Sequence, residues 1–144
     1  MTLDGLNKYQ PYALTALRVV TALAYMAHGT QKMFDFPSAG ADGASFELFT
    51  LMGLAGVLEL FGGLAILLGL FTRPVAFILA GQMAYAFWFV HVPLMGQGNI
   101  IPAANGGDAA VLFCFVFLYL VFAGPGAFSA DEALKSRRGN AVPA

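Results

Sequence analysis

Residues 47–70 read ELFTLMGLAGVLELFGGLAILLGL, and this stretch decides the fold class. After its first residue it carries a single charged side chain, that of Glu59, near its middle. A helix that spans a bilayer core of about 30 Å needs roughly 20 mostly apolar residues. The stretch meets this requirement, so it predicts a membrane-spanning helix.

Three further stretches meet the same requirement: Tyr12–Phe34, Pro74–Leu94 and Asp108–Gly124. The segments between them are rich in Gly, Pro, Asn and Asp, as turns are. Pro74 suits the first position of its helix, where its missing amide hydrogen costs nothing. Asn105 suits a cap just ahead of the last helix. The sequence therefore predicts an all-α fold, an antiparallel bundle of four transmembrane helices.

This bundle occupies residues 12–128 of the predicted organisation. Residues 1–11 precede it as a short segment, and residues 129–144 follow it as a polar tail that we expect to fray.

Composition supports the membrane class. Of 144 residues, 59% are apolar and 10% are charged, whereas soluble domains average about 45–50% apolar and about 25% charged. The net charge of −1 gives no footprint for nucleic acid. Cys114 is the one cysteine, which excludes an internal disulfide and a cysteine-based metal site within one chain.

The basic residues predict the orientation. An even number of spans puts both chain ends on one side of the membrane. The side with the chain ends carries five basic residues, and the opposite loops carry only Lys32. The five are Lys8, Arg73, Lys135, Arg137 and Arg138. By the positive-inside rule, both ends lie in the cytoplasm.

Small residues surround Glu59 at helical spacing, and they predict close packing. Ala55, Gly56, Gly62 and Gly63 lie three or four positions from it, so this face of the helix is nearly bare of side chains. Such a face lets another helix approach, and it could also support a homo-oligomer.

Ionisable side chains inside the spans are the unusual feature of the chain, because each costs about 2.5–3.5 kcal/mol or more on insertion. On the first span Arg18, His28, Gln31 and Lys32 share one side, together with Thr21 and Tyr25. We expect Glu59 to form an ion pair with Arg18. The pair could be structural, or Glu59 could be a proton-accepting or ligand-binding carboxylate.

A second group of polar residues is predicted to converge at the outer end of the bundle, while Gln82 lies at mid-depth in a polar interior. The converging residues are His28, Gln31, Lys32, His91, Asn105 and Asp108. Because Pro93 disfavours helical geometry just before it, His91 is expected at a fraying helix end.

Three kinds of chemistry could use this layer. The two histidines could ligate haem or a metal ion, but no ligand motif supports this. A quinone headgroup could accept hydrogen bonds from His, Gln or Lys, with a carboxylate as proton acceptor. The layer could also be a hydrogen-bonded lid that only closes the bundle.

Motifs along nearly the whole chain resemble the DoxX family. They are Arg18, His28-Gly29-x-Gln31-Lys32, Glu59-x-x-Gly62-Gly63 leading to Leu68-Gly69-Leu70-Phe71-Thr72-Arg73, Asn105-Gly106-Gly107-Asp108, and Gly124-Pro125-Gly126 with Ser129 and Asp131. The family's usual glutamate after its Asn-Gly-Gly is here the shorter Asp108. The resemblance implies a multi-pass protein of the bacterial inner membrane, associated with quinol oxidase and thiosulfate:quinone oxidoreductase systems. It transmits no proven catalytic residue.

Three functional hypotheses follow. In the first, the chain is a membrane subunit that binds quinone and works with a redox enzyme. Glu59 or Asp108 accepts a proton, and Arg18, His28, Gln31, Lys32, Gln82, His91 and Asn105 form the ligand site without a metal. In the second, it is a non-catalytic anchor or assembly factor whose polar residues are structural. In the third, it is a conduit for protons or small solutes along Arg18, Glu59 and His28.

Overall fold

The computed structural model describes residues 3–38 and 46–139, and every element formed by these residues is helical. The elements are η1 (Leu3–Tyr9), α1 (Gln10–Phe34), α2 (Leu51–Val57), η2 (Leu58–Gly62), α3 (Gly63–Leu68), α4 (Thr72–Ala86), η3 (Phe87–Met95), α5 (Pro102–Asn105), α6 (Asp108–Ala123) and α7 (Ala130–Gly139). All four stretches predicted as helices are helical. The predicted all-α class is therefore confirmed.

Among the residues that the structure describes, two helices are long and apolar enough to cross a membrane. They are Leu51–Leu68, formed by α2, η2 and α3 in succession, and Thr72–Met95, formed by α4 and η3. Helix α6 is a shorter apolar helix, and α1 is longer but carries the polar side chains noted above. A helical membrane protein is consistent with these lengths.

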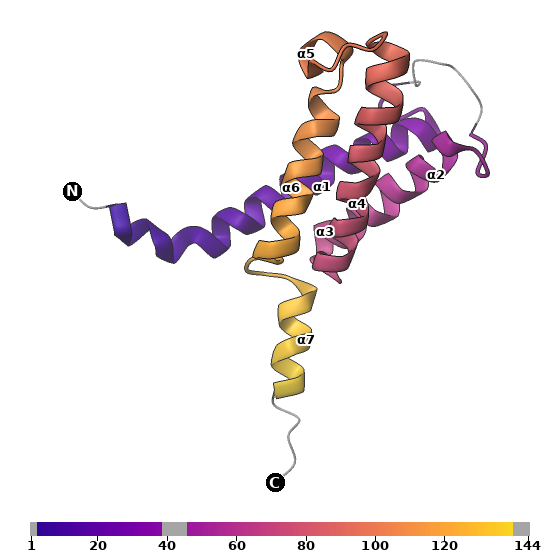
Figure 1. Cartoon of the computed structure of the whole chain (residues 1–144). Coiled ribbons are helices and arrows are strands. Elements are labelled where there is room, and N and C mark those ends of the chain that lie inside the picture. Colours follow the sequence, from indigo (N-terminus) through magenta and orange to yellow (C-terminus); the bar gives the residue numbers. More distant parts are fainter. Residues whose placement is uncertain (1–2, 39–45, 140–144) are drawn as a thin grey trace.

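The helices pack as two antiparallel pairs (Figure 1). Helix α1 packs along α2, η2 and α3, and α4 packs most extensively against α6. Edge-to-face contacts of Tyr25 with Phe113 and Phe117 join α1 to α6. Helix α5 lies beyond one end of the α4–α6 pair, and α7 extends away from the other end. We call these the Lys32 end and the Arg18 end, after the α1 residue near each.

Glycines permit the close approach of α1 to its neighbour, as the small-residue pattern predicts. A Cβ added to Gly29 would lie 2.6 Å from the backbone nitrogen of Leu60, and one added to Gly63 would lie 2.5 Å from Cγ of Met26. Gly62 faces a different helix, because a Cβ there would lie 2.7 Å from Leu79 of α4. The prediction of close packing is confirmed.

Two segments widen from α-helical to π-helical geometry. The first, η2, carries Glu59, and the second, η3, carries His91 and Pro93. The amide of Gly96 donates to the carbonyl of His91 at 2.7 Å, so the helix continues past Pro93. The expectation that His91 lies at a fraying end is therefore wrong, because the wider turn accommodates the proline.

Three local predictions about helix ends need correction. Pro74 is the third residue of α4, which begins at Thr72. Asn105 ends α5, and Gly107 occupies the cap position of α6, although the Asn105 side chain still accepts from the amide of Gly107. Residues 130–139 form α7 where the sequence predicted a frayed tail, and residues 140–144 lie outside the described part.

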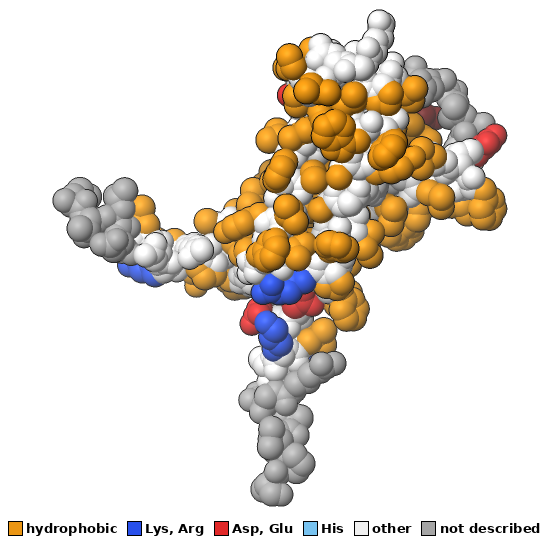
Figure 2. All heavy atoms as spheres, viewed as in Figure 1, with side chains coloured by type: hydrophobic (Ala, Val, Ile, Leu, Met, Phe, Trp, Pro, Cys, Tyr) orange, Lys and Arg blue, Asp and Glu red, His pale blue; other side chains and the backbone are white. Residues whose placement is uncertain are grey.

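The surface of the helices is largely apolar (Figure 2). Large side chains such as Val20, Phe77, Phe115 and Phe122 are each more than 60% exposed, whereas Phe117 and Leu120 are fully buried. A folded protein in water rarely presents so large an apolar surface. The distribution is typical of a membrane protein.

Candidate functional site

Glu59 forms the centre of a buried polar group at the Lys32 end. The Lys32 ammonium lies 2.7 Å from Oε2 of Glu59. The Glu59 side chain is 5% exposed and that of Lys32 is 24% exposed, so the pair opens to its surroundings on the lysine side. A charge-assisted contact of this length is among the stronger hydrogen bonds that proteins form.

Gln82 extends this group from α4. Its Nε2 lies 3.4 Å from Oε1 of Glu59 and 3.4 Å from the carbonyl of Ala55. Both of these oxygens only accept hydrogen bonds, so the amide NH₂ must face them. The amide oxygen of Gln82 is thereby left to accept from the Tyr25 hydroxyl at 3.0 Å. We call Lys32, Glu59, Gln82 and Tyr25 the buried polar chain.

Arg18 does not pair with Glu59. Its side chain is 1% exposed and donates only to backbone carbonyls. Nη1 reaches Ile66 at 2.7 Å and Leu67 at 2.6 Å, near the end of α3. Nε and Nη2 reach the segment after α6 at Pro125 (2.8 Å) and Phe128 (3.1 Å). The expected Arg18–Glu59 ion pair is wrong.

The cause is the register between α1 and its neighbour. Gly29 lies against Gly56 and Leu60, so Glu59 is level with the last turns of α1. Arg18 lies about three turns earlier, roughly 16 Å away along the axis at 1.5 Å per residue. Arg18, Glu59 and His28 thus do not form the continuous stripe that a conduit would need.

Helices at the Arg18 end are capped by residues of other helices. Arg73 of α4 donates to the carbonyls of Val121 (2.6 Å) and Phe122 (2.9 Å) near the end of α6. In return, the carboxylate of Asp131 in α7 accepts from the amides of Phe71 (2.8 Å) and Thr72 (2.9 Å) at the start of α4. These contacts satisfy backbone groups that a helix leaves unpaired at its ends.

The Asp131 carboxyl is held in its charged form. Partial burial raises its pKa, but hydrogen bonds from the Thr72 and Phe71 amides and the charge of Lys135 lower it. The net result is a pKa below the ordinary value for aspartate. A negative charge at the start of a helix is also favoured by the helix dipole.

His91 and Asn105 meet in the turn around α5. Nδ1 of His91 lies 3.3 Å from the carbonyl of Asn105. The Asn105 side chain is buried, donates to the carbonyl of Asn99 at 2.8 Å and accepts from the amide of Gly107 at 2.8 Å. These contacts fix the shape of the turn between η3 and α6.

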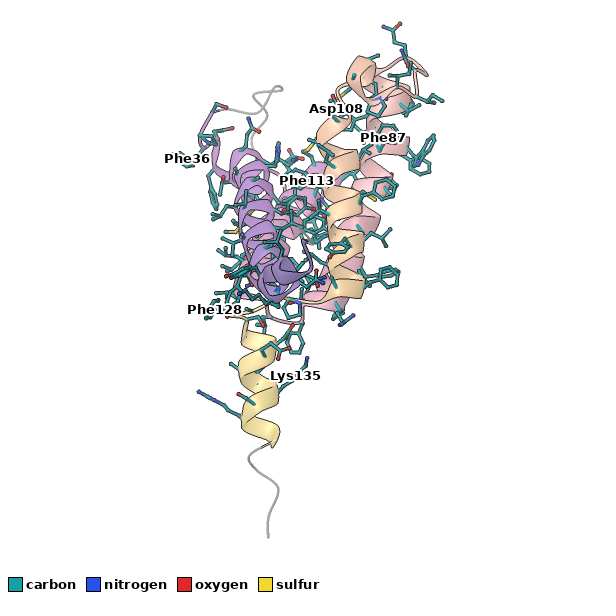
Figure 3. All side chains as sticks on the ribbon, turned by 90° about the vertical axis from the view of Figure 1, so that its left-hand side faces the viewer. Phe36, Phe87, Asp108, Phe113, Phe128 and Lys135 are labelled. Carbon is teal, nitrogen blue, oxygen red and sulfur yellow. The ribbon has the colours of Figure 1, made fainter. Side chains whose placement is uncertain are left out.

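The predicted outer layer therefore divides into separate groups. Lys32 joins Glu59, His91 joins Asn105, and Gln31 donates to Ser38 at 3.2 Å. His28 is exposed on α1, with its ring centre 5.9 Å from that of Phe113 on α6. Asp108 is exposed at the start of α6, at the opposite end of that helix from Phe128 and Lys135 (Figure 3).

The buried polar chain joins an ammonium group, a carboxylate, an amide and a hydroxyl by hydrogen bonds, and it is open to its surroundings on the lysine side. Glu59 contributes a buried carboxylate, and Lys32 contributes an ammonium group that remains partly exposed. His28 lies one helical turn before Lys32, so the two share a face of α1. Among the described residues, no three His, Cys, Asp or Glu side chains cluster as metal ligands would.

The sequence does not predict the contacts made by Tyr25, Asp131 and Arg73. Tyr25 was noted in the polar stripe of α1 but was not assigned to the site, although its helical spacing from Lys32 was a usable signal. From the sequence, Asp131 is recognised only as part of a motif, and Arg73 only as part of a motif and as a positive charge. The capping role of each depends on a residue about 50–60 positions away, which local pattern cannot reveal.

Known proteins are similar to this chain over most of its length. An uncharacterized protein of Haemophilus influenzae is 46% identical over 133 residues, covering 90% of this chain and 96% of that protein. An uncharacterized membrane protein of Mycobacterium tuberculosis is 25% identical over 141 residues, covering 88% of this chain and 84% of that protein. No solved structure matches the chain. A sequence model of DoxX matches residues 13–92, which is more than half of the chain, and the protein therefore belongs to the DoxX family.

Proposed function

We propose that this DoxX family membrane protein is a subunit of a quinone-linked redox system of the bacterial inner membrane. A quinone or quinol headgroup binds at the Lys32 end of α1. The observation that carries the proposal is the Lys32–Glu59 pair at 2.7 Å, in which a buried carboxylate meets a partly exposed ammonium group. Exposed His28 lies one turn away on the same helix face.

The donor set suits a quinone headgroup. Its carbonyl oxygens accept hydrogen bonds, and His28 and Lys32 offer donors side by side on an apolar exterior. Phe113 beside His28 adds an aromatic surface for the ring. A quinol bound there would give two electrons to a partner redox enzyme and release two protons as it became a quinone.

The chain's own residues manage the proton. Glu59 accepts it, while Gln82 holds Oε1 and Lys32 holds Oε2, so the carboxylate keeps one orientation. Asp108, exposed at the start of α6, is a second proton acceptor. The buried polar chain ends at Tyr25, which lies among aromatic rings of α6 that exclude water.

The proposal includes the membrane topology. Helices α1 and α6 cross the bilayer together with Leu51–Leu68 and Thr72–Met95, giving four spans. Both chain ends lie in the cytoplasm. Exposed apolar side chains on all four spans support the crossing of the bilayer. Arg73 and Lys135 near the Arg18 end support the orientation, because basic residues are more frequent on the cytoplasmic side.

Binding of a short-chain ubiquinone analogue to the full chain in nanodiscs tests the site. We expect His28→Ala and Lys32→Met each to weaken binding by about tenfold, as the loss of one hydrogen bond to a ligand does. His91→Ala is the matched control, because that histidine contacts Asn105 and lies outside the proposed site.

Equal affinity in wild type, His28→Ala and Lys32→Met would contradict the proposal. An absorption spectrum and a lipid extract of gently purified protein provide a second measurement. Co-purified quinone supports the proposal, whereas a haem Soret band would replace it with the haem alternative.

A second candidate function, a non-catalytic anchor or assembly factor, is favoured by Arg18. The buried Arg18 side chain donates to four backbone carbonyls, and these contacts join the end of α3 to the segment after α6. Under this hypothesis, Glu59→Gln lowers stability but leaves the activity of a co-assembled redox enzyme unchanged per complex.

A further inference from the structure

Two adjoining cavities lie at the Arg18 end, where α7 leaves the other helices. The larger has a volume of about 450 Å³ and the smaller about 280 Å³. Arg73, Pro125 and Lys135 line both. Both are open to the surface of the molecule.

Arg73 presents a fixed positive charge to these cavities. Its Nη1 is held by the carbonyls of Val121 and Phe122, which orients the planar guanidinium group. Gly124 leaves room for it, since a Cβ there would lie 3.2 Å from Nη2. An arginine oriented in this way is suited to a phosphate group.

Lys135 provides a second positive charge that can be redirected. Its ammonium lies 2.8 Å from Oε1 of Glu132, but the two side chains are 71% and 52% exposed. An exposed pair of this kind contributes little stability, so Lys135 can turn to another anion. Asp131, which lines the smaller cavity, is already bound by two backbone amides.

On the α1 side, the larger cavity is lined by the apolar Pro11 and Leu14 and by the polar Gln10. Ala123 of α6 also lines it. Nearby, the exposed rings of Tyr12 on α1 and Phe128 beyond α6 lie against each other, with their centres 5.8 Å apart. Figure 2 shows that Lys, Arg, Asp and Glu side chains meet at this junction, directly below an apolar surface. A ligand that joins a phosphate to an acyl chain matches both parts.

We propose that this junction binds the phosphate-bearing headgroup of an anionic phospholipid, with Arg73 and Lys135 as its ligands. The inference rests on the proposed orientation, which puts the Arg18 end at the cytoplasmic membrane surface, and does not depend on quinone binding. Basic pockets between transmembrane helices on that side bind such headgroups in other proteins.

Native mass spectrometry of the full chain in a neutral detergent tests the proposal, with dioleoylphosphatidylglycerol, dioleoylphosphatidylcholine and inorganic phosphate as probes. We expect one phosphatidylglycerol molecule to bind in preference to phosphatidylcholine. Lys135→Gln weakens this binding by about fivefold, which is the usual effect of one basic residue at a membrane surface. Glu132→Gln, which frees Lys135, strengthens it.

Arg137→Gln is the matched control, because it removes one positive charge from the same helix without touching either cavity. An equal loss in Lys135→Gln and Arg137→Gln would overturn the site in favour of diffuse attraction. Equal binding of the two lipids would overturn recognition of charge, and displacement of the lipid by an equal concentration of inorganic phosphate would overturn the lipid assignment.

Arg73→Gln is expected to weaken binding as well, but it also uncaps α6, so Lys135→Gln is the decisive variant. Its melting temperature in detergent without lipid should equal that of wild type. Quinone binding by Lys135→Gln should also be unchanged, so a failure of the quinone proposal and a failure of the lipid proposal give different results.

Discussion

At the scale of single residues, the chain accommodates buried charge in two different ways. Arg18 is surrounded by backbone carbonyls of two separate segments, so its charge joins α3 to the segment after α6. Glu59 instead meets a counter-ion, Lys32, and a neutral amide, Gln82. The first arrangement has no carboxylate to titrate, whereas the second leaves a charged pair partly open to its surroundings.

Arg18→Met should lower the free energy of unfolding by roughly 3–5 kcal/mol, because several buried carbonyls lose their donor at once. Arg18→Lys should recover only part of this loss, since one ammonium group cannot reach both segments. Denaturant unfolding in detergent measures the effect. A loss no larger than that of Arg137→Met, an exposed change on α7, would contradict the proposed role.

Lys32 and Glu59 should be energetically coupled. Glu59→Gln and Lys32→Met each leave a charge without its partner, and each should cost about 3 kcal/mol, the lower end of the range for a broken buried pair. The double variant should cost less than the sum of the two. Arg18→Met combined with Glu59→Gln provides the control, and its two effects should add.

The residue types of the site could be predicted from sequence, but their partners could not. The polar stripe on α1 and the isolated Glu59 can be recognised from sequence, because polar and ionisable side chains in an apolar span cost free energy on insertion. The choice of Lys32 over Arg18 depends on where the second helix begins. It starts at Leu51, four residues after the predicted Glu47, and its register is set by the contact of Gly29 with Gly56.

At the scale of helices, close packing and shared caps define the assembly. Glycines let the backbones of α1 and η2 touch, and this contact brings Lys32 to Glu59. At the opposite end, each of Arg73 and Asp131 completes the terminus of a helix other than its own. The start of α4 and the end of α6 therefore depend on other helices for part of their hydrogen bonding.

Gly29→Ala should destabilise the protein and weaken the Lys32–Glu59 contact. A Cβ at this position would lie 2.6 Å from backbone nitrogen, which cannot move aside as a side chain can. We expect a cost of about 1–3 kcal/mol, the usual penalty for overpacking. Gly81→Ala on α4 is the control, since a Cβ there meets nothing within 4 Å, and it should be neutral or slightly stabilising.

Asp131 should make stability depend on acid pH. Its folded pKa is lowered, so its contribution is complete above the ordinary aspartate value of about 3.9 and is lost as the pH falls through the lower folded value. Wild type should therefore lose melting temperature more steeply than Asp131→Asn below about pH 4. Glu132→Gln, an exposed change beside it, should keep the wild-type slope.

The extents of the helices were predictable because each follows the length of an apolar run. The π-helical turns and α7 were not predictable in this way. The spacing of apolar residues does not distinguish a π-helical turn from an α-helical one. Helix α7 contains no apolar run by which it could be recognised. Its position depends on Asp131 binding the start of α4, a contact between residues far apart in the chain.

At the scale of the whole molecule, polarity is distributed along the axis of the bundle. The apolar surface covers the sides of the helices, and charged side chains gather where α7 begins (Figure 2). The Lys32 end carries the turn around α5, where Ile100 and Ile101 are exposed, and exposed Asp108 at the start of α6. This distribution supports the proposed topology, in which the Arg18 end lies at the cytoplasmic surface of the membrane.

Reporter fusions should detect this orientation. Alkaline phosphatase folds only outside the cytoplasm, so its fusion after residue 98 should be active and its fusion after residue 139 inactive. A fluorescent protein fused after residue 139 should fluoresce. The positive-inside rule is the physical reason, and activity of both phosphatase fusions would contradict an even number of spans.

The bond between Asp131 and the start of α4 also bears on how the protein is made. The ribosome synthesises Phe71 and Thr72 well before Asp131, which lies about 60 residues later in the chain. Until then the first turn of that helix lacks its acceptor, and Arg18 lacks the carbonyls of Pro125 and Phe128. The helices inserted earlier therefore stay incompletely joined until the segment from Pro125 to Asp131 has been synthesised.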